Sequence, residues 1–290
     1  MSAHNLSREL SRNQSVQARF YRAVINNYLL SASALIVIIV LLTAIWGPML
    51  SPHDPLKTDI SLRLATPSFQ YPLGNDALGR CLFSRILSGG RMSIGLGISV
   101  VTFSCLLGVL IGLVAGYHGG IVDELLMRIA DIFLSLPEIV AAMTLAGIMG
   151  PGTFSLIFAL SITGWMRYAR LVRGITLSVR ERDYVKAAQF SGLSRIHIVF
   201  RHILPANIGS IIVLATIGLA KAIIAVSALG FLGFGVQPPA PEWGTLLMEG
   251  KDYILSAPHL SIYPGIAVMF SVLAFNILGD GLRDVWNLEQ

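Results

Sequence analysis

The stretch that decides the fold is Asp183-Tyr-Val-Lys-Ala-Ala-Gln-Phe-Ser-Gly192, and it is soon followed by Ser194-Arg-Ile-His-Ile-Val-Phe-Arg-His-Ile-Leu-Pro205. Together they form a basic, polar segment between two strongly apolar ones. The pair Ala187-Ala188 predicts a shallow helix face that another surface can approach closely. Gly192 stands where a helix C-cap needs a left-handed backbone, and Pro205 is expected to end the preceding helix. The segment is therefore suited to docking against another protein surface, and its residues match no catalytic signature.

The composition of the whole chain indicates a membrane protein. Of its 290 residues, 54% are hydrophobic and only 13% are charged, with a mean hydropathy of +0.71. A soluble domain carries roughly 25% charged residues. The net charge of +5 is therefore interpreted by its location along the chain and does not indicate nucleic-acid binding.

Six apolar segments are long enough to cross a bilayer, which requires about 20 residues of helix. They are approximately 29–49, 93–116, 125–149, 153–172, 206–234 and 261–280. Because backbone groups in lipid must be paired within their own segment, these spans predict an all-α, polytopic bundle. The polar residues 1–28 are interpreted as a cytoplasmic tail before an uncleaved first span, and 29–290 as the transmembrane domain.

Lysine and arginine gather on one side of these spans. Fourteen lie on the side of the N-terminal tail and segment 167–205, whereas six lie on the side of segments 51–92 and 236–260. The positive-inside rule then places both termini and the docking loop 173–205 in the cytoplasm. Segment 50–92 is expected outside the cytoplasm, and its five basic residues are the weakest point of this assignment.

Two local features of the spans make further predictions. Gly108, Gly112 and Gly116 recur at four-residue spacing, so they share one helix face that a neighbouring helix can approach closely. Asp131 is expected to pair with Arg128, three residues before it on a helix.

Two ionisable residues lie at membrane depth, where a charge is expensive and usually faces the bundle interior. Lys221 is about 15 residues into its span, and Glu138 directly follows Pro137. Both are candidates for lining a translocation path or for pairing across a subunit interface. Lys221 in particular is expected to lie near a carboxylate or a ring of carbonyls.

The spacing of the docking loop resembles the "EAA" loop in the membrane subunits of ATP-binding-cassette (ABC) importers. In that family the loop forms short cytoplasmic helices that seat in a cleft on the ATPase subunit. Lys186 stands where the family pattern has Glu, and His202 stands where it has Ile, although the Tyr-Val-x-Ala-Ala form resembles the peptide and nickel branch. The docking residues that the resemblance implies are Asp183, Tyr184, Ala187, Ala188, Gly192, Leu204 and Pro205.

Four further strings resemble the dipeptide, oligopeptide and nickel permeases of this family. They are Leu73-Gly-Asn-Asp-Ala-Leu-Gly-Arg80, Ala115-Gly-Tyr-His-Gly-Gly120, Leu229-Gly-Phe-Leu-Gly-Phe-Gly235 and Phe275-Asn-Ile-Leu-Gly-Asp-Gly-Leu-Arg-Asp284. In the first string, Asn75 replaces the usual Thr, and Cys81 directly after it replaces the usual Asp. With their order along the chain, these strings extend the resemblance over about residues 50 to 284.

The resemblance implies the type I ABC importer permease fold and a place in the bacterial cytoplasmic (inner) membrane. It also implies a heterodimer with a second, homologous permease, two cytoplasmic ATPase subunits and an extracytoplasmic solute-binding protein. ATP-driven closure of the ATPases would be transmitted to the spans through 183–205. The substrate stays open among dipeptides, longer peptides, nickel and metal–chelator complexes.

Several other chemistries lack their residues. The sequence has no Gly-x-x-x-x-Gly-Lys-Ser/Thr phosphate loop, so ATP is expected to bind to partner subunits and the chain itself to be non-catalytic. Its six histidines and two cysteines form no metal-binding spacing, and no cofactor is indicated. The alternative function is an ion- or proton-coupled secondary transporter, in which Glu138 and Lys221 would relay charge. Such transporters typically show an internal repeat, and none is visible in this sequence.

Overall fold

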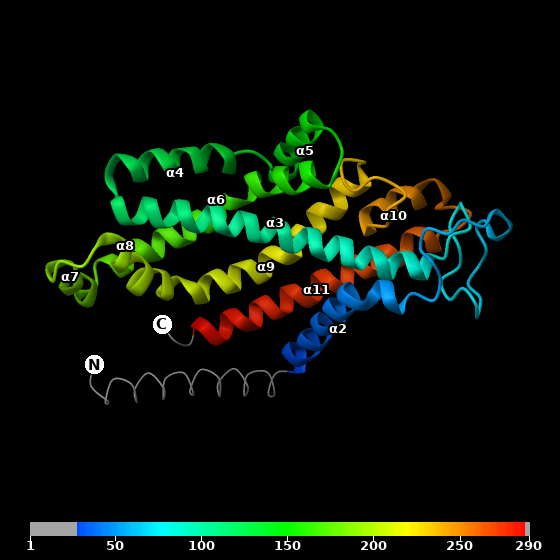
Figure 1. The fold of residues 1–290 in the computed structure, drawn as a ribbon, viewed down its shortest axis with the longest axis horizontal. Coiled ribbons are helices and arrows are strands. Elements are labelled where there is room, and N and C mark those ends of the chain that lie inside the picture. Colours follow the sequence, from blue (N-terminus) through cyan, green and yellow to red (C-terminus); the bar gives the residue numbers. More distant parts are fainter. Residues whose placement is uncertain (1–27, 288–290) are drawn as a thin grey trace.

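The computed structural model describes residues 28–287 and shows an elongated bundle of helices (Figure 1). Within that range no residue is part of a strand ladder, and the two residues of one isolated bridge are Asn75 and Cys81. The helices are α2 (Tyr28–Leu50), α3 (Leu82–His118), α4 (Gly120–Leu134), α5 (Glu138–Met149), α6 (Thr153–Arg180), α7 (Asp183–Phe190), α8 (Arg195–Ile198), α9 (Leu204–Phe231), α10 (Trp243–Gly250) and α11 (His259–Asn287). Three short helical turns, η1 (Ile60–Leu62), η2 (Val199–Ile203) and η3 (Lys251–Tyr253), complete the set.

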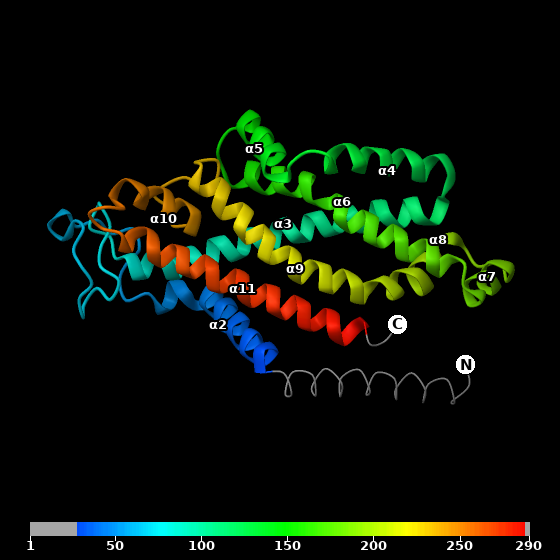
Figure 2. The same ribbon diagram turned by 180° about the vertical axis from the view of Figure 1, so that it is seen from behind.

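The long helices α2, α3, α6, α9 and α11 run side by side along the bundle. The two ends of the bundle carry different elements. One end carries α7 and α8, and the other carries α10 and the segment between α2 and α3 (Figures 1 and 2). Of the predicted cytoplasmic tail, 1–28, residues 1–27 lie outside the described residues.

Four helices in the described range are long and apolar enough to cross a membrane: Ser31–Leu50, Leu82–His118, Arg195–Phe231 and His259–Asp284. Many of their large apolar side chains point outward, as lipid-facing side chains do; on α2 these include Leu35, Ile38, Ile39, Leu42 and Ile45. The α4–α5 pair would count as a fifth crossing. The remaining predicted span, 153–172, lies within α6, whose arginines lower its hydropathy, so six crossings stay a prediction.

The predicted third span, 125–149, is not one straight helix. It is broken into α4 and α5, which meet at 90°. Pro137 precedes α5, and proline disfavours helical backbone in the residue before it while lacking an N–H to donate. The break therefore has a local cause in the sequence, and it places Glu138 at the first turn of a new helix.

The glycine face of α3 packs directly against α6, as predicted. A Cβ added at Gly112 would lie 2.6 Å from the carbonyl oxygen of Ala169 and 2.9 Å from the Cβ of Val172. At Gly108 it would lie 2.4 Å from the Cβ of Tyr168, and at Gly116 2.7 Å from the Cβ of Thr176. The three glycines thus let the two helix backbones approach closely over about two turns.

Gly112→Ala is expected to destabilise the protein by about 1–3 kcal/mol, because the added methyl group overlaps backbone atoms of α6 that cannot move independently. Gly95→Ala on the same helix is the matched control, since a Cβ there meets no atom within 4 Å. The measurement is the thermal unfolding midpoint of the purified protein in detergent. Equal midpoints for the two variants would contradict the close α3–α6 contact.

The expectation that Pro205 ends the preceding helix is wrong. The chain stays helical from Arg195 to Phe231, with Pro205 in the first turn of α9. The reason is the π-helical turn η2, in which the Leu204 amide donates to the carbonyl of Val199. A π-turn widens the helix and re-routes its hydrogen bonds, so the missing proline N–H and the bulk of its ring are accommodated.

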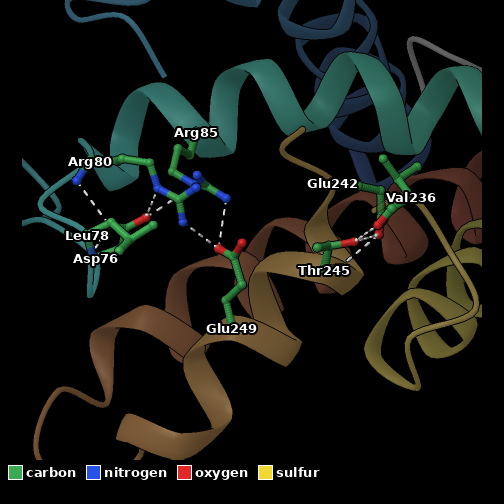
Figure 3. A network of polar contacts seen from close by, with 8 residues as sticks. All are labelled: Asp76, Leu78, Arg80, Arg85, Val236, Glu242, Thr245 and Glu249. Atoms are coloured by element: carbon green, nitrogen blue, oxygen red, sulfur yellow. Dashed lines mark hydrogen bonds and ion pairs between the residues drawn. The ribbon is translucent and has the colours of Figure 1, made fainter. Parts of the chain in front are cut away.

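At the α10 end, four charged residues form a buried ion network (Figure 3). Arg80 donates to Asp76 at 2.6 Å and to Glu249 at 3.0 Å, and Arg85 donates to Glu249 at 2.8 Å. The Arg85 side chain is 0% exposed. The network ties the segment before α3 to α10, which follows it by more than 160 residues in the chain.

A second buried carboxylate, Glu242, begins α10. It accepts hydrogen bonds from the hydroxyl of Ser93 at 2.8 Å and from the amides of Gly244 and Thr245, each at 2.9 Å (Figure 3). Burial raises the pKa of Glu242, while these hydrogen bonds favour its charged form. Glu242 therefore caps α10 and fixes it against α3.

Candidate functional site

A cavity of about 320 Å³ lies in the middle of the bundle, between α3, α5, α6 and α9. Most of its lining is aliphatic, for example Val100, Ile139, Leu160 and Ile217. Its ionisable side chains are Glu138, Arg167, Tyr168 and Lys221. A mostly apolar cavity with a few convergent polar groups is typical of a small-molecule site.

Glu138 is held in place by Arg167 of α6. One guanidinium nitrogen of Arg167 donates to both carboxylate oxygens of Glu138, at 2.6 and 2.9 Å. The two side chains are still 39% and 33% exposed in the isolated chain. Because Glu138 also lies at the N-terminus of α5, the helix dipole adds to the stabilisation of its charge.

Lys221 of α9 lines the same cavity, so the structure brings together the two residues that the sequence singled out. Its side chain is exposed, and no ion pair or hydrogen bond joins its ammonium group to any other residue in 28–287. No carboxylate in this part of the chain pairs with Lys221, since Glu138, which lines the same cavity, pairs with Arg167. The expected carboxylate or ring of carbonyls near Lys221 stays a prediction. Among residues 28–287, the Lys221 ammonium group thus has no partner.

These groups are able to bind a small polar solute. Broken helices at membrane depth occur where the freed backbone is buried in protein or lines a water-filled cavity. Here the α4–α5 break lies next to Glu138, which lines the cavity. The cavity is about 24 Å along a helix from Pro205, because Lys221 follows it by sixteen residues at 1.5 Å each.

The docking loop forms two short helices, α7 and α8, which precede the N-terminal end of α9. Helix α7 ends in a Schellman motif, in which the Gly192 amide donates to Gln189 and the Leu193 amide donates to Ala188. Gly192 has a φ of +75°, as its predicted capping role requires. The turn therefore fixes the direction of the chain between α7 and α8.

The loop is anchored by a small apolar core and presents its other side outward. Val185, Ala188, Ile198 and Ile203 are buried against side chains of α3 and α6. Of the predicted docking residues, Asp183, Tyr184, Ala187, Gly192 and Pro205 are exposed, Leu204 is half-buried and Ala188 is buried. Of the two alanines predicted to form a shallow helix face, only Ala187 is on the outer surface. Ala188 is buried and helps to hold α7 in place.

The two departures from the family pattern have local partners. Lys186 pairs with Glu181 at 3.1 Å, and this hydrogen bond and charge hold the pKa of the Glu181 carboxyl below its usual value. His202 lies beside Tyr184, with ring centroids 6.0 Å apart. Both side chains therefore stabilise the loop itself.

The exposed apolar side chains of this loop are not among the docking residues predicted from the sequence. Phe190 is 92% exposed, Ile196 72% and Phe200 62%. Large apolar residues in an otherwise polar segment are the sequence signal for such a surface. Their burial under a partner protein would remove apolar area from water.

The predicted pairing of Asp131 with Arg128 is wrong. Arg128 pairs with Glu124, four residues before it on α4, and Asp131 accepts from Arg170 of α6. Asp123 likewise pairs with Arg173. Asp123 and Asp131 therefore attach α4 to α6.

Comparison with known proteins gives two family matches. Residues 108–287 match the family described as binding-protein-dependent transport system inner membrane component. Residues 18–67 match the N-terminal TM domain of oligopeptide transport permease C. The first match covers more than half of the chain and contains both the docking loop and the cavity residues Glu138, Arg167 and Lys221.

Individual relatives are similar over almost the whole chain. The glutathione transport system permease protein GsiD of Pectobacterium atrosepticum is 40% identical over 91% of this chain and 88% of its own length. The dipeptide transport system permease protein DppC of Alkalihalophilus pseudofirmus is 39% identical over 91% and 87%. The probable D,D-dipeptide transport system permease protein DdpC of Escherichia coli is 40% identical over 87% and 85%.

Two solved structures share the fold at low sequence identity. An inward-facing MetNI methionine ABC transporter structure aligns with a TM-score of 0.56 and 18% identity, over 69% of this chain and 95% of the other. An amino acid ABC transporter solved with histidines aligns with a TM-score of 0.51 and 18% identity, over 71% and 94%. The predicted all-helical fold of an ABC importer permease is confirmed.

Proposed function

The chain belongs to the family of binding-protein-dependent transport system inner membrane components, and we propose that it forms one half of a peptide-carrying path through the bacterial inner membrane. It is a multi-pass permease subunit of an ATP-driven importer and makes or breaks no bond itself. Peptide transport is favoured over nickel because the permeases compared above are named for glutathione and dipeptides. The single observation that carries the proposal is the cavity at the α4–α5 break, which α9 joins to the docking loop.

The family implies ATPase and solute-binding partners. We assign the ATPase contact to the exposed side of the loop 173–205, including Asp183, Tyr184, Ala187 and Gly192, with Phe190 added from the structure. Ala188 and Leu204, which are buried and half-buried, support this surface from behind, and the exposed Pro205 lies in the first turn of α9. Movement of α7 and α8 on ATPase closure would be passed along α9 to the cavity, as two-state coupling through a rigid element requires.

A second, homologous permease is proposed to cover the open side of the cavity. Glu138, Arg167 and Lys221 are all partly exposed in the isolated chain, yet they lie on helices at membrane depth. Charged side chains at that depth face protein or water rather than lipid. A partner permease at this face would enclose a shared path and shield the three charges from lipid.

The proposal is tested by purifying the tagged chain from membranes of cells that also express the neighbouring transport genes. The expected complex contains this chain, one second permease and two ATPase subunits. A chain that purifies alone in mild detergent, while the tagged neighbouring subunits purify together without it, would exclude the assignment.

We further propose that both termini and the loop 173–205 lie in the cytoplasm and that segment 50–92 lies outside it. The imbalance of fourteen against six basic residues supports this orientation. Two of the basic residues on the minority side, Arg80 and Arg85, are buried in ion pairs with carboxylates rather than free at the surface. Their presence there weighs little against the proposal.

Single cysteines at two exposed positions check the orientation. Gln70→Cys, in the segment before α3, is expected to react with a membrane-impermeant maleimide added to intact spheroplasts. Gln189→Cys, on α7, is expected to react only after the membrane is opened. The native cysteines are replaced in both variants, and the reverse pattern of labelling would invert the proposed topology.

A further inference from the structure

Lys221 has an unusual electrostatic position among the residues of the cavity. Arg167 already holds Glu138 through two contacts, so those two charges compensate each other. Lys221 lines the same 320 Å³ cavity and has no partner among residues 28–287. With its three charged side chains ionised, the cavity therefore carries one excess positive charge.

When the proposed second permease covers the cavity, an uncompensated ammonium group there is costly, and its field is strong because the aliphatic walls screen it little. Val101, Leu214, Ile217 and Ile224 are among the cavity residues in this part of the bundle. Such a site attracts an anionic group and repels a bare divalent cation. A hydrated metal ion would be repelled by Lys221. Glu138 would not be available to bind it, because Glu138 already pairs with the guanidinium of Arg167.

We infer that Lys221 receives the free carboxylate of the transported peptide and that the path thereby selects carboxylate-bearing substrates against cationic ones. This inference rests on the proposed function, because it takes the cavity to be the translocation path. The carboxylate would form a charge-assisted hydrogen bond with the ammonium group. The aliphatic lining would contact the apolar part of the peptide.

The test measures ATP-dependent uptake of dialanine and of dialanine amide by the reconstituted complex in proteoliposomes. The affinity of the binding protein for each probe is measured separately, and both probes are supplied at saturation. The unaltered complex is expected to transport the free acid about tenfold faster than the amide, since the amide lacks the charge that Lys221 binds. In Lys221→Gln the ratio is expected to fall to about twofold or less, and Lys221→Arg is expected to keep most of it.

Lys57→Gln is the matched control, because it removes an exposed lysine far along the chain from the cavity residues and should leave the ratio unchanged. An unchanged ratio in Lys221→Gln overturns the inference. So does loss of the second permease from the Lys221→Gln complex, because Lys221 would then be an interface residue. Absence of ATP-dependent uptake of either probe by the unaltered complex would instead overturn the proposed function.

A measurement that is independent of the binding protein reads the same electrostatic field. Ile139→Cys, at the cavity, is reacted with an anionic and with a cationic methanethiosulfonate reagent of similar size. The anionic reagent is expected to react faster, by about tenfold, and this preference should disappear when Lys221→Gln is added. Equal rates in the presence of Lys221 would overturn the inference even if the amide is never delivered.

Discussion

Replacing Glu249 with alanine is expected to lower the free energy of unfolding by about 3–5 kcal/mol. Glu249 is the carboxylate that Arg85 and Arg80 share, at 2.8 and 3.0 Å. Without it, two buried guanidinium groups retain only Asp76, and Arg85, which is 0% exposed, cannot reach water. The measurement is the thermal unfolding midpoint of the purified protein, which should fall by about 6 °C or more.

Glu124→Ala is the matched control for this loss. Glu124 also pairs with an arginine, but the side chains of Arg128 and Glu124 are 72% and 61% exposed. Such a pair contributes at most about 1 kcal/mol, so its loss should barely move the midpoint. Arg85→Leu combined with Glu249→Leu should recover part of the stability, because it removes the buried charge together with its partner. Similar losses from Glu249→Ala and Glu124→Ala would contradict the buried network.

Replacing Phe190 with aspartate is expected to abolish coupling to the ATPases without unfolding the chain. Phe190 is 92% exposed, so the isolated chain gains little from its ring. At a partner interface, an aromatic anchor is worth about 2 kcal/mol or more, which corresponds to roughly 30-fold in affinity, and a buried carboxylate would add a further cost. The measurements are ATPase co-purification and ATP-dependent uptake, which should fall together.

Phe69→Asp is the control, because it makes the same change at a side chain that is fully exposed in the segment before α3. It should leave ATPase co-purification unchanged. Gly192→Asp is a second variant on the docking side: its φ of +75° strains any residue with a Cβ, and the added charge faces the same surface. Normal co-purification and uptake with both Phe190→Asp and Gly192→Asp would show that this loop is not the ATPase contact.

Local sequence pattern was enough to predict the features that depend on neighbours along the chain. The glycine face at Gly108, Gly112 and Gly116 follows from helical period, and it indeed packs against α6. The capping role of Gly192 follows from the freedom of glycine to adopt a left-handed backbone at the end of a helix. Lys221 and Glu138 were singled out by charge at membrane depth alone, and they line one cavity.

The features that were missed depend on partners far away in the sequence. Glu138 pairs with Arg167, and Asp131 with Arg170, across 29 and 39 residues. The Arg85–Glu249 contact spans 164 residues. Charge pattern on one helix cannot reveal such partners, which is why the nearby Arg128 was chosen wrongly for Asp131.

Proline limits the prediction of helix ends from sequence, because a proline can end a helix or lie inside one. Pro137 ends a helix and bends the third span by 90°, whereas Pro205 is absorbed by the π-turn before it. The presence of a proline therefore does not by itself show whether a helix ends, since Pro48 and Pro264 also lie inside helices.

The most direct test of the central claim is the energy source of uptake in proteoliposomes that contain the complete complex and its binding protein. Dialanine uptake is expected to require ATP on the side of the docking loop and to continue when the proton gradient is collapsed by an uncoupler. Uptake by this chain without its ATPases, driven by an imposed proton gradient and abolished by Glu138→Gln or Lys221→Gln, would contradict the account and identify a secondary transporter instead.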